Sequence, residues 1–125
     1  MKKLSLILLI ATALLLFSCG SSVPEDKKTV VITAKNVSVG ENLLSYMERT
    51  GVKFTTQSKD FVVSINGTAA GLAEYWLLFT DDPEFGTESY GTLDHDGKTY
   101  LSAIVGITDL IIKEGKTYVW NLQKF

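Results

Sequence analysis

The chain is poor in the residues on which most catalytic sites depend. Its 125 residues include one cysteine, Cys19, and one histidine, His95. A single cysteine excludes an intramolecular disulfide, even in an oxidising compartment. A Ser-His-Asp triad would have to use His95, and the sequence has neither a Gly-x-Ser-x-Gly elbow nor a glycine-rich phosphate loop before Lys-Ser or Lys-Thr. We therefore predict that the protein is not an enzyme.

The chain also has fewer basic than acidic residues. Twelve lysine and arginine residues stand against fourteen aspartate and glutamate residues, a net charge of −2. If an N-terminal segment carrying Lys2 and Lys3 is removed, ten basic residues remain against fourteen acidic ones, a net charge of −4. Because nucleic-acid binding needs a basic face, we predict no nucleic-acid partner. The mild acidity favours solubility instead.

The apolar run at the N-terminus is too short to be a permanent membrane anchor. It covers residues 4–17 and is interrupted only by Ser5 and Thr12, whereas a spanning helix needs about 20 residues. Lys2 and Lys3 precede the run and small residues follow it. This order of a basic, an apolar and a small-residue region is typical of an export signal.

The segment ends at Cys19. The tetrad Leu16-Phe17-Ser18-Cys19 resembles a bacterial lipobox, which implies that residues 1–18 are a lipoprotein signal peptide and that Cys19 is lipidated. The resemblance also implies a location at the extracytoplasmic face of the cell membrane. Two or more acyl chains give stable anchoring there. The alternative is an ordinary secretory signal with an incidental cysteine. Residues 19–28 contain Pro24 and polar residues, and are predicted to be a flexible tether.

Residues 29–125 fit one small domain. A capping box formed by Ser38 and Glu41 predicts the start of a helix, and Gly51 is placed to end it. The order is one strand, the helix and then several strands, so we predict an α+β domain that is β-grasp-like, with a mixed sheet crossed by one helix. Strands are expected at residues 29–34, 52–56, 61–65, 75–80, 98–101 and 116–125, and a long irregular loop at residues 81–98.

Alternation along two strands predicts which side chains face the core. Tyr118, Trp120 and Leu122 lie two residues apart, so they point to one side of the last strand. Tyr75 and Trp76 are adjacent, so they face opposite sides of theirs. We expect one of these two to pack under the helix. Both are either core residues or, through their flat rings, a surface on which a ligand stacks.

Four stretches of the domain, residues 38–44, 61–67, 74–79 and 113–120, follow the order and spacing of a known family. The most specific part is the spaced pair Ile65-Asn66-Gly67 and Tyr75-Trp76. These motifs resemble the transcobalamin-like C-terminal domain family of bacterial surface proteins, which is similar to the β domain of transcobalamin and intrinsic factor. The resemblance implies a β-grasp-like domain that contacts a corrinoid or another small ligand. The large helical domain that makes most of the cobalamin contacts in transcobalamin has no counterpart in this sequence.

The candidate ligand-binding residues carry a ring or an amide within these motifs and the predicted loop. Asn66, followed by Gly67, either forms a hairpin turn or reaches a ligand. Phe85 and Tyr90 either pack onto the domain or form a binding rim. The predicted site consists of Asn66, Tyr75, Trp76, Phe85 and Tyr90.

The same predicted loop holds several acidic residues around Asp94-His95-Asp96. In an extended chain, Asp94 and Asp96 share a face and His95 points away. A hard cation such as Ca²⁺ needs six to eight oxygens in a compact set. We therefore predict a solvated acidic loop and no metal site.

The sequence thus predicts a lipid-anchored extracytoplasmic module that binds a small ligand and is accessory to the uptake of cobalamin or a similar nutrient. Its partners would be the membrane, the ligand and a membrane transporter, and no cofactor is expected apart from cobalamin as the ligand. One alternative is a surface adhesion module that binds a protein or a glycan. Another is a metal-binding lipoprotein.

Overall fold

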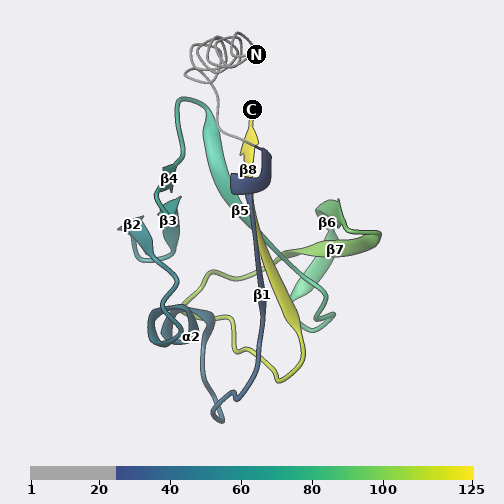
Figure 1. The fold of residues 1–125 in the computed structure, drawn as a ribbon. Helices are drawn as coiled ribbons and strands as arrows, with labels where there is room; N and C mark the ends of the chain where they lie inside the picture. Colours follow the sequence, from purple (N-terminus) through teal and green to yellow (C-terminus); the bar gives the residue numbers. More distant parts are fainter. Residues whose placement is uncertain (1–24) are drawn as a thin grey trace, which may run out of the picture.

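The computed structural model describes residues 25–125, so the predicted signal peptide, Cys19 and most of the predicted tether lie outside the described residues. Strands dominate the fold, and one short α-helix accompanies them (Figure 1). This confirms the α+β class in its broad form. In chain order the elements are η1 (Glu25–Lys27), β1 (Thr29–Thr33), α2 (Leu43–Arg49), β2 (Phe54–Ser58), β3 (Phe61–Ile65), β4 (Thr68–Ala69), β5 (Glu74–Thr80), β6 (Gly86–His95), β7 (Lys98–Ala103) and β8 (Thr117–Lys124).

The strands form two sheets, and every strand pairing within residues 25–125 is antiparallel, so the predicted mixed sheet is wrong. The larger sheet has the order β1-β8-β5-β7-β6, and the smaller has the order β2-β3-β4. β8 starts where β1 ends, with Thr33 opposite Thr117. The chain therefore reaches the far end of β1 before β8 begins, and β8 runs back along it. A parallel neighbour would need a crossover that returns the chain to the start of β1.

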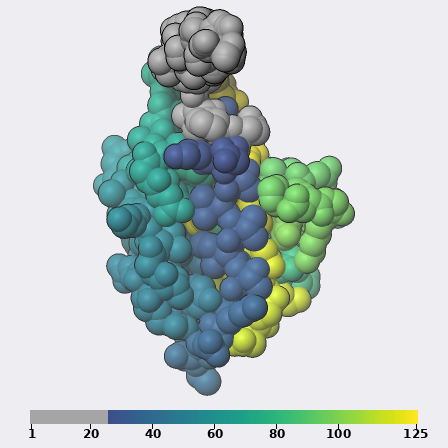
Figure 2. Space-filling model, in the orientation of Figure 1, coloured from purple at the N-terminus to yellow at the C-terminus, as the bar shows by residue number. Residues whose placement is uncertain are grey.

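The prediction of a long irregular loop at residues 81–98 is also wrong. β6 and β7 form a hairpin that projects from the side of the molecule (Figures 1 and 2). Asp96 and Gly97 join the two strands with φ of 50° and 77°, as a two-residue hairpin turn requires. Asn66 and Gly67, with φ of 48° and 85°, join β3 to β4 in the same way and confirm the hairpin-turn alternative.

The α-helix begins later than the capping box predicted. Asn42, and not Ser38, is the N-cap, and its side chain accepts an amide hydrogen bond of 2.9 Å from the first turn. Glu41 does accept the expected hydrogen bond from the amide of Ser38, at 3.1 Å. Gly40 between them has a φ of 76°, so this bond closes a turn ahead of the helix. The end is confirmed, since Gly51 follows the helix with a φ of 83°.

The helix has seven residues and depends on a distant part of the chain. Residues 104–112, which we call the 104–112 segment, pass its N-terminus. The amide of Leu43 donates to the carbonyl of Leu110 at 3.0 Å, and the amide of Leu44 donates to the carbonyl of Ile107 at 3.1 Å. These first-turn amides have no partner inside the helix. Because an isolated helix of this length is not stable in water, the 104–112 segment holds it in place.

The main core lies among one face of the larger sheet, α2, the smaller sheet and the 104–112 segment. Tyr118, Trp120 and Leu122 of β8 are all buried in this core, which confirms the predicted alternation. On β5, Trp76 is 4% exposed in the same core and Tyr75 is 43% exposed, so the two do face opposite sides. The other face of the larger sheet carries a second buried cluster of Phe79, Tyr100 and Val119.

The smaller sheet is fastened to the 104–112 segment where Asp60 meets Gly106. The Asp60 carboxylate accepts hydrogen bonds from the amide and the hydroxyl of Thr108, at 2.9 and 2.8 Å. A Cβ at Gly106 would overlap the Asp60 side chain.

We expect Gly106→Ala to lower the free energy of unfolding by about 2 kcal/mol, measured by urea unfolding. The exposed neighbour Asp109 provides the control, since Asp109→Ala should change it by less than about 0.5 kcal/mol. Equal effects of the two substitutions would contradict this close contact.

Candidate functional site

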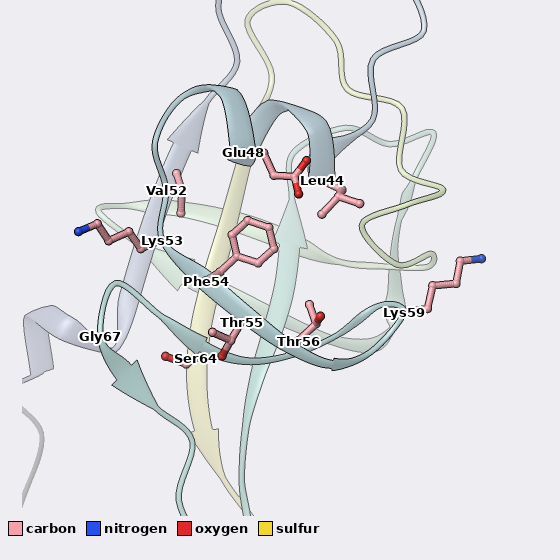
Figure 3. Close-up of a pocket in the computed structure, with 10 residues that line it drawn as sticks. All are labelled: Leu44, Glu48, Val52, Lys53, Phe54, Thr55, Thr56, Lys59, Ser64 and Gly67. Atoms are coloured by element: carbon pink, nitrogen blue, oxygen red, sulfur yellow. The ribbon is translucent and has the colours of Figure 1, made fainter.

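A large groove lies between α2 and the hairpin of β2 and β3 (Figure 3). We call it the helix–sheet groove. Its volume is about 980 Å³, at the upper end of the roughly 300–1,000 Å³ that small-molecule sites occupy. Its lining residues are Leu44, Glu48, Val52, Lys53, Phe54, Thr55, Thr56, Lys59, Ser64 and Gly67.

Three half-buried apolar side chains form the floor of the helix–sheet groove. Leu44 comes from α2, Val52 from the turn that follows it, and Phe54 from the start of β2. In Figure 3 the ring of Phe54 lies between the helix and the strand. All three also pack against the main core. These contacts with the core hold the floor in position without a ligand, as in a preformed ligand site.

The polar wall of the groove comes from β2 because this strand lies at the edge of the smaller sheet. After half-buried Phe54, every residue of β2 is exposed. Thr55 and Thr56 both line the groove. An exposed edge strand usually carries polar side chains, and here they give the groove hydrogen-bonding groups beside its apolar floor.

Two lysine side chains lie at opposite ends of the groove and extend outward from it (Figure 3). Figure 3 shows Lys53 and Lys59 on either side of it, with Glu48 entering from α2. Among residues 25–125, none of these three side chains makes an ion pair. Their charges are therefore free to meet a ligand, with a net charge of about +1 around the groove. Such a site suits a molecule with an apolar body and oxygen acceptors at its edge.

A smaller pocket of about 260 Å³ lies against the larger sheet, and we call it the tryptophan pocket. Trp76, Trp120 and Tyr90 are among its lining residues. The indole nitrogen of Trp76 donates to the carbonyl of Thr68 at 3.1 Å. The indole nitrogen of Trp120 is buried and has no acceptor in the described part of the chain. Because that nitrogen has no exposed surface, a ligand in the pocket does not reach it.

The five predicted site residues do not gather in one place. Trp76 and Tyr90 share the tryptophan pocket, although Trp76 is buried and Tyr90 is 76% exposed. Asn66 lies at the β3–β4 turn beside the helix–sheet groove, and its side chain accepts a backbone hydrogen bond of 3.3 Å. Tyr75 contacts other exposed rings on a separate surface. Phe85 is half-buried and packs against the main core.

Sequence reasoning overlooked the helix–sheet groove. The threonine, serine and lysine residues that line it carry no motif of their own. The one available signal was the change of character after Phe54, where residues 55–59 are all polar. That pattern is typical of an edge strand, and an edge strand that follows a short amphipathic helix leaves room for a groove between the two.

No three histidine, cysteine or acidic side chains of residues 25–125 come together as a metal site would require. His95 lies 3.6 Å from the carboxylate of Asp96. Asp94 accepts a hydrogen bond of 2.6 Å from the hydroxyl of Thr99 on the neighbouring strand. These groups belong to the exposed end of the β6–β7 hairpin.

Two broader findings bear on function. Along the part of the chain that the structure describes, no helix has the length and apolar character to cross a membrane. Comparison with known protein families, with characterised proteins and with solved structures gave no match.

Proposed function

We propose that the protein is a lipid-anchored, extracytoplasmic module that binds a small ligand in the helix–sheet groove. The observation that carries the proposal is the groove itself, about 980 Å³ in volume. Its apolar floor packs on the core, and its charged groups make no ion pair within the described residues. A preformed hollow of this kind supports binding, and we propose no catalytic role.

The anchor in this proposal rests on the lipobox-like residues 16–19. Acyl chains on Cys19 would keep the domain at the outer face of the membrane. Tethering holds captured ligand at a high effective concentration beside a membrane transporter. In this proposal the domain hands the ligand over to the transporter and does not need to retain it for long.

The resemblance to the transcobalamin-like C-terminal domain family supports a corrinoid as the ligand class. A corrinoid has an apolar ring body with amide and phosphate oxygens at its edge, and Lys53 and Lys59 supply donors at the ends of the groove. We also propose the β-grasp-like arrangement implied by the resemblance. Its support is that the opening strand β1 lies beside the closing strand β8 and that α2 packs into the same core.

Calorimetric titration of the full-length lipidated protein in detergent with cyanocobalamin tests the proposal. We expect saturable binding that Thr56→Arg weakens at least about tenfold, because an arginine on the exposed wall fills part of the groove. Thr92→Arg is the matched control, since Thr92 is an exposed threonine of β6 away from the groove, and it should leave the affinity unchanged.

Two outcomes would count against the proposal. If cyanocobalamin gives no binding heat, the corrinoid assignment is wrong and the adhesion alternative gains. If cyanocobalamin binds but Thr92→Arg weakens it as much as Thr56→Arg does, the site is not the helix–sheet groove.

A further inference from the structure

Three aromatic side chains, one from the smaller sheet and two from the larger sheet and its C-terminal end, form an exposed cluster. The rings of Phe61 and Tyr75 lie 6.3 Å apart, and those of Tyr75 and Phe125 lie 5.7 Å apart. Phe61 is 41% exposed, Tyr75 43% and Phe125 73%, and Leu72 nearby is 93% exposed. We call these four residues the terminal aromatic cluster. An exposed apolar group of this kind usually marks an interaction surface.

The terminal aromatic cluster lies at the end of the molecule where the chain enters the domain. β1 starts with Thr29 opposite Asn121, and β8 continues beyond this pair to Lys124, which Phe125 follows. Three residues of strand carry the chain about 10 Å further. The amide of Phe125 donates to the carbonyl of Ala73 at 2.7 Å, which brings Leu72 to the same end. Figure 1 shows the C-terminus, η1 and the β4–β5 connection together at this end.

The chain between the proposed anchor and the domain is short. Residues 19–24 precede η1, so six residues, beginning with Cys19 itself, connect the proposed anchor to the domain. At full extension six residues span at most about 20 Å. An acylated Cys19 therefore keeps this end of the domain, and not the opposite end at Val39, within about 20 Å of the lipid surface.

We propose that the terminal aromatic cluster inserts into the headgroup region of the bilayer, so that the domain stands on the membrane by this end. The proposal rests on the lipid anchor of the proposed function. Tyrosine, phenylalanine and leucine are the side chains that bind at membrane interfaces. In this proposal apolar contact drives insertion.

This arrangement leaves the helix–sheet groove open to the surroundings. The groove is lined by α2 and the β2–β3 hairpin, and α2 lies toward the opposite end of the molecule from the C-terminus (Figure 1). Standing on the terminal aromatic cluster, the domain holds its proposed ligand site away from the headgroups. A second point of attachment beside the anchor also limits rotation of the domain on its tether.

Quenching by brominated lipid tests the proposal in the full-length lipidated protein, reconstituted in phosphatidylcholine vesicles. A tryptophan is introduced by Phe125→Trp, and Val39→Trp is the matched control at the opposite end, where Val39 is fully exposed. We expect brominated phosphatidylcholine to remove roughly a third or more of the emission added by Phe125→Trp, because interfacial side chains lie about 5–10 Å deep. Val39→Trp should lose none. Leu72→Ser, at a 93% exposed position, should reduce the quenching of Phe125→Trp without unfolding the domain.

The outcomes separate this inference from the anchor on which it rests. If the protein is acylated and sediments with vesicles, but Phe125→Trp is not quenched or Val39→Trp is quenched equally, insertion is wrong and the anchor stands. If the new tryptophan is shielded from acrylamide yet not quenched by the lipid, a second copy or another protein covers the cluster, and the proposal is overturned. If Cys19 carries no acyl chain, both proposals are overturned.

Discussion

Replacing Trp76 by alanine is expected to lower the free energy of unfolding by about 4 kcal/mol. The side chain is 4% exposed in the main core, and its indole nitrogen donates to the carbonyl of Thr68 at 3.1 Å. The substitution removes a large apolar ring and also a bond that joins β4 to β5. Since a domain of this size has a total stability of about 5–15 kcal/mol, the variant should unfold at much lower urea concentrations, which circular dichroism of the purified protein would measure.

Its neighbour Tyr75 is the matched control for this prediction. Tyr75 lies on the opposite face of β5 and is 43% exposed, so Tyr75→Ala should cost less than about 1 kcal/mol. Equal losses at the two positions would contradict the assignment of faces. The large cost at Trp76 also means that a loss of ligand binding in Trp76→Ala would report unfolding, so substitutions in the helix–sheet groove are the better test of the proposed function.

Replacing Lys113 by methionine is expected to cost about 3 kcal/mol, because it leaves a buried carboxylate without a cation. The Asp82 side chain is 2% exposed, and one of its oxygens lies 2.7 Å from the ammonium of Lys113. The other oxygen accepts a hydrogen bond of 2.9 Å from the amide of Glu84. The Glu84 carboxylate contacts the same ammonium, but it is exposed and can turn to solvent. Thermal or urea unfolding would measure the loss.

Two further variants check that the effect belongs to this ion pair. Lys35→Met changes an exposed lysine without an ion pair among the described residues, and should change the stability by less than about 0.5 kcal/mol. Asp82→Asn removes the buried charge and keeps its shape, so it should cost about 1 kcal/mol and therefore less than Lys113→Met. If Asp82→Asn were the more destabilising of the two, the explanation by an unpaired charge would be wrong.

The same ion pair fixes the pH range in which Lys113 contributes. Hydrogen bonds to Asp82 and then to Glu84 raise the pKa of Lys113 above its ordinary value of 10.5. Because the folded protein holds this proton more tightly than the unfolded chain does, the stabilisation is fully present below about pH 10.5 and is lost as the pH rises through the folded-state pKa. The difference between the wild-type chain and Lys113→Met should therefore be constant between pH 6 and about pH 9, and should shrink in more alkaline solution.

Three of the strands predicted from the sequence, β3, β5 and β8, contribute buried side chains to the main core. β3, β5 and β8 alternate or are apolar throughout, and their burial follows that pattern. β6 was not predicted because it is mostly exposed on both faces and therefore shows no alternation. Its one clear signal was the pair Asp96 and Gly97, which closes the β6–β7 hairpin in the same way that Asn66 and Gly67 close the β3–β4 hairpin. A turn dipeptide can thus reveal a strand that has no periodic pattern.

The helix–sheet groove could not be predicted because contacts between distant residues position it. Asp60 binds Thr108, 48 residues later in the chain, and the amides of the first turn of α2 bind carbonyls of the 104–112 segment. Neither contact leaves a local pattern in the sequence. The predicted site residues were chosen for ring and amide chemistry, and that chemistry identified Trp76 and Phe85, which pack in the core.

The 104–112 segment has a consequence for any attempt to shorten or cut this protein. All lining residues of the helix–sheet groove fall within residues 44–67, yet the helix that forms one wall is held by carbonyls of Ile107 and Leu110. A peptide excised around residues 44–67 would lose that wall. A single protease nick near Ile107 would likewise weaken that wall while sparing every residue that lines the groove.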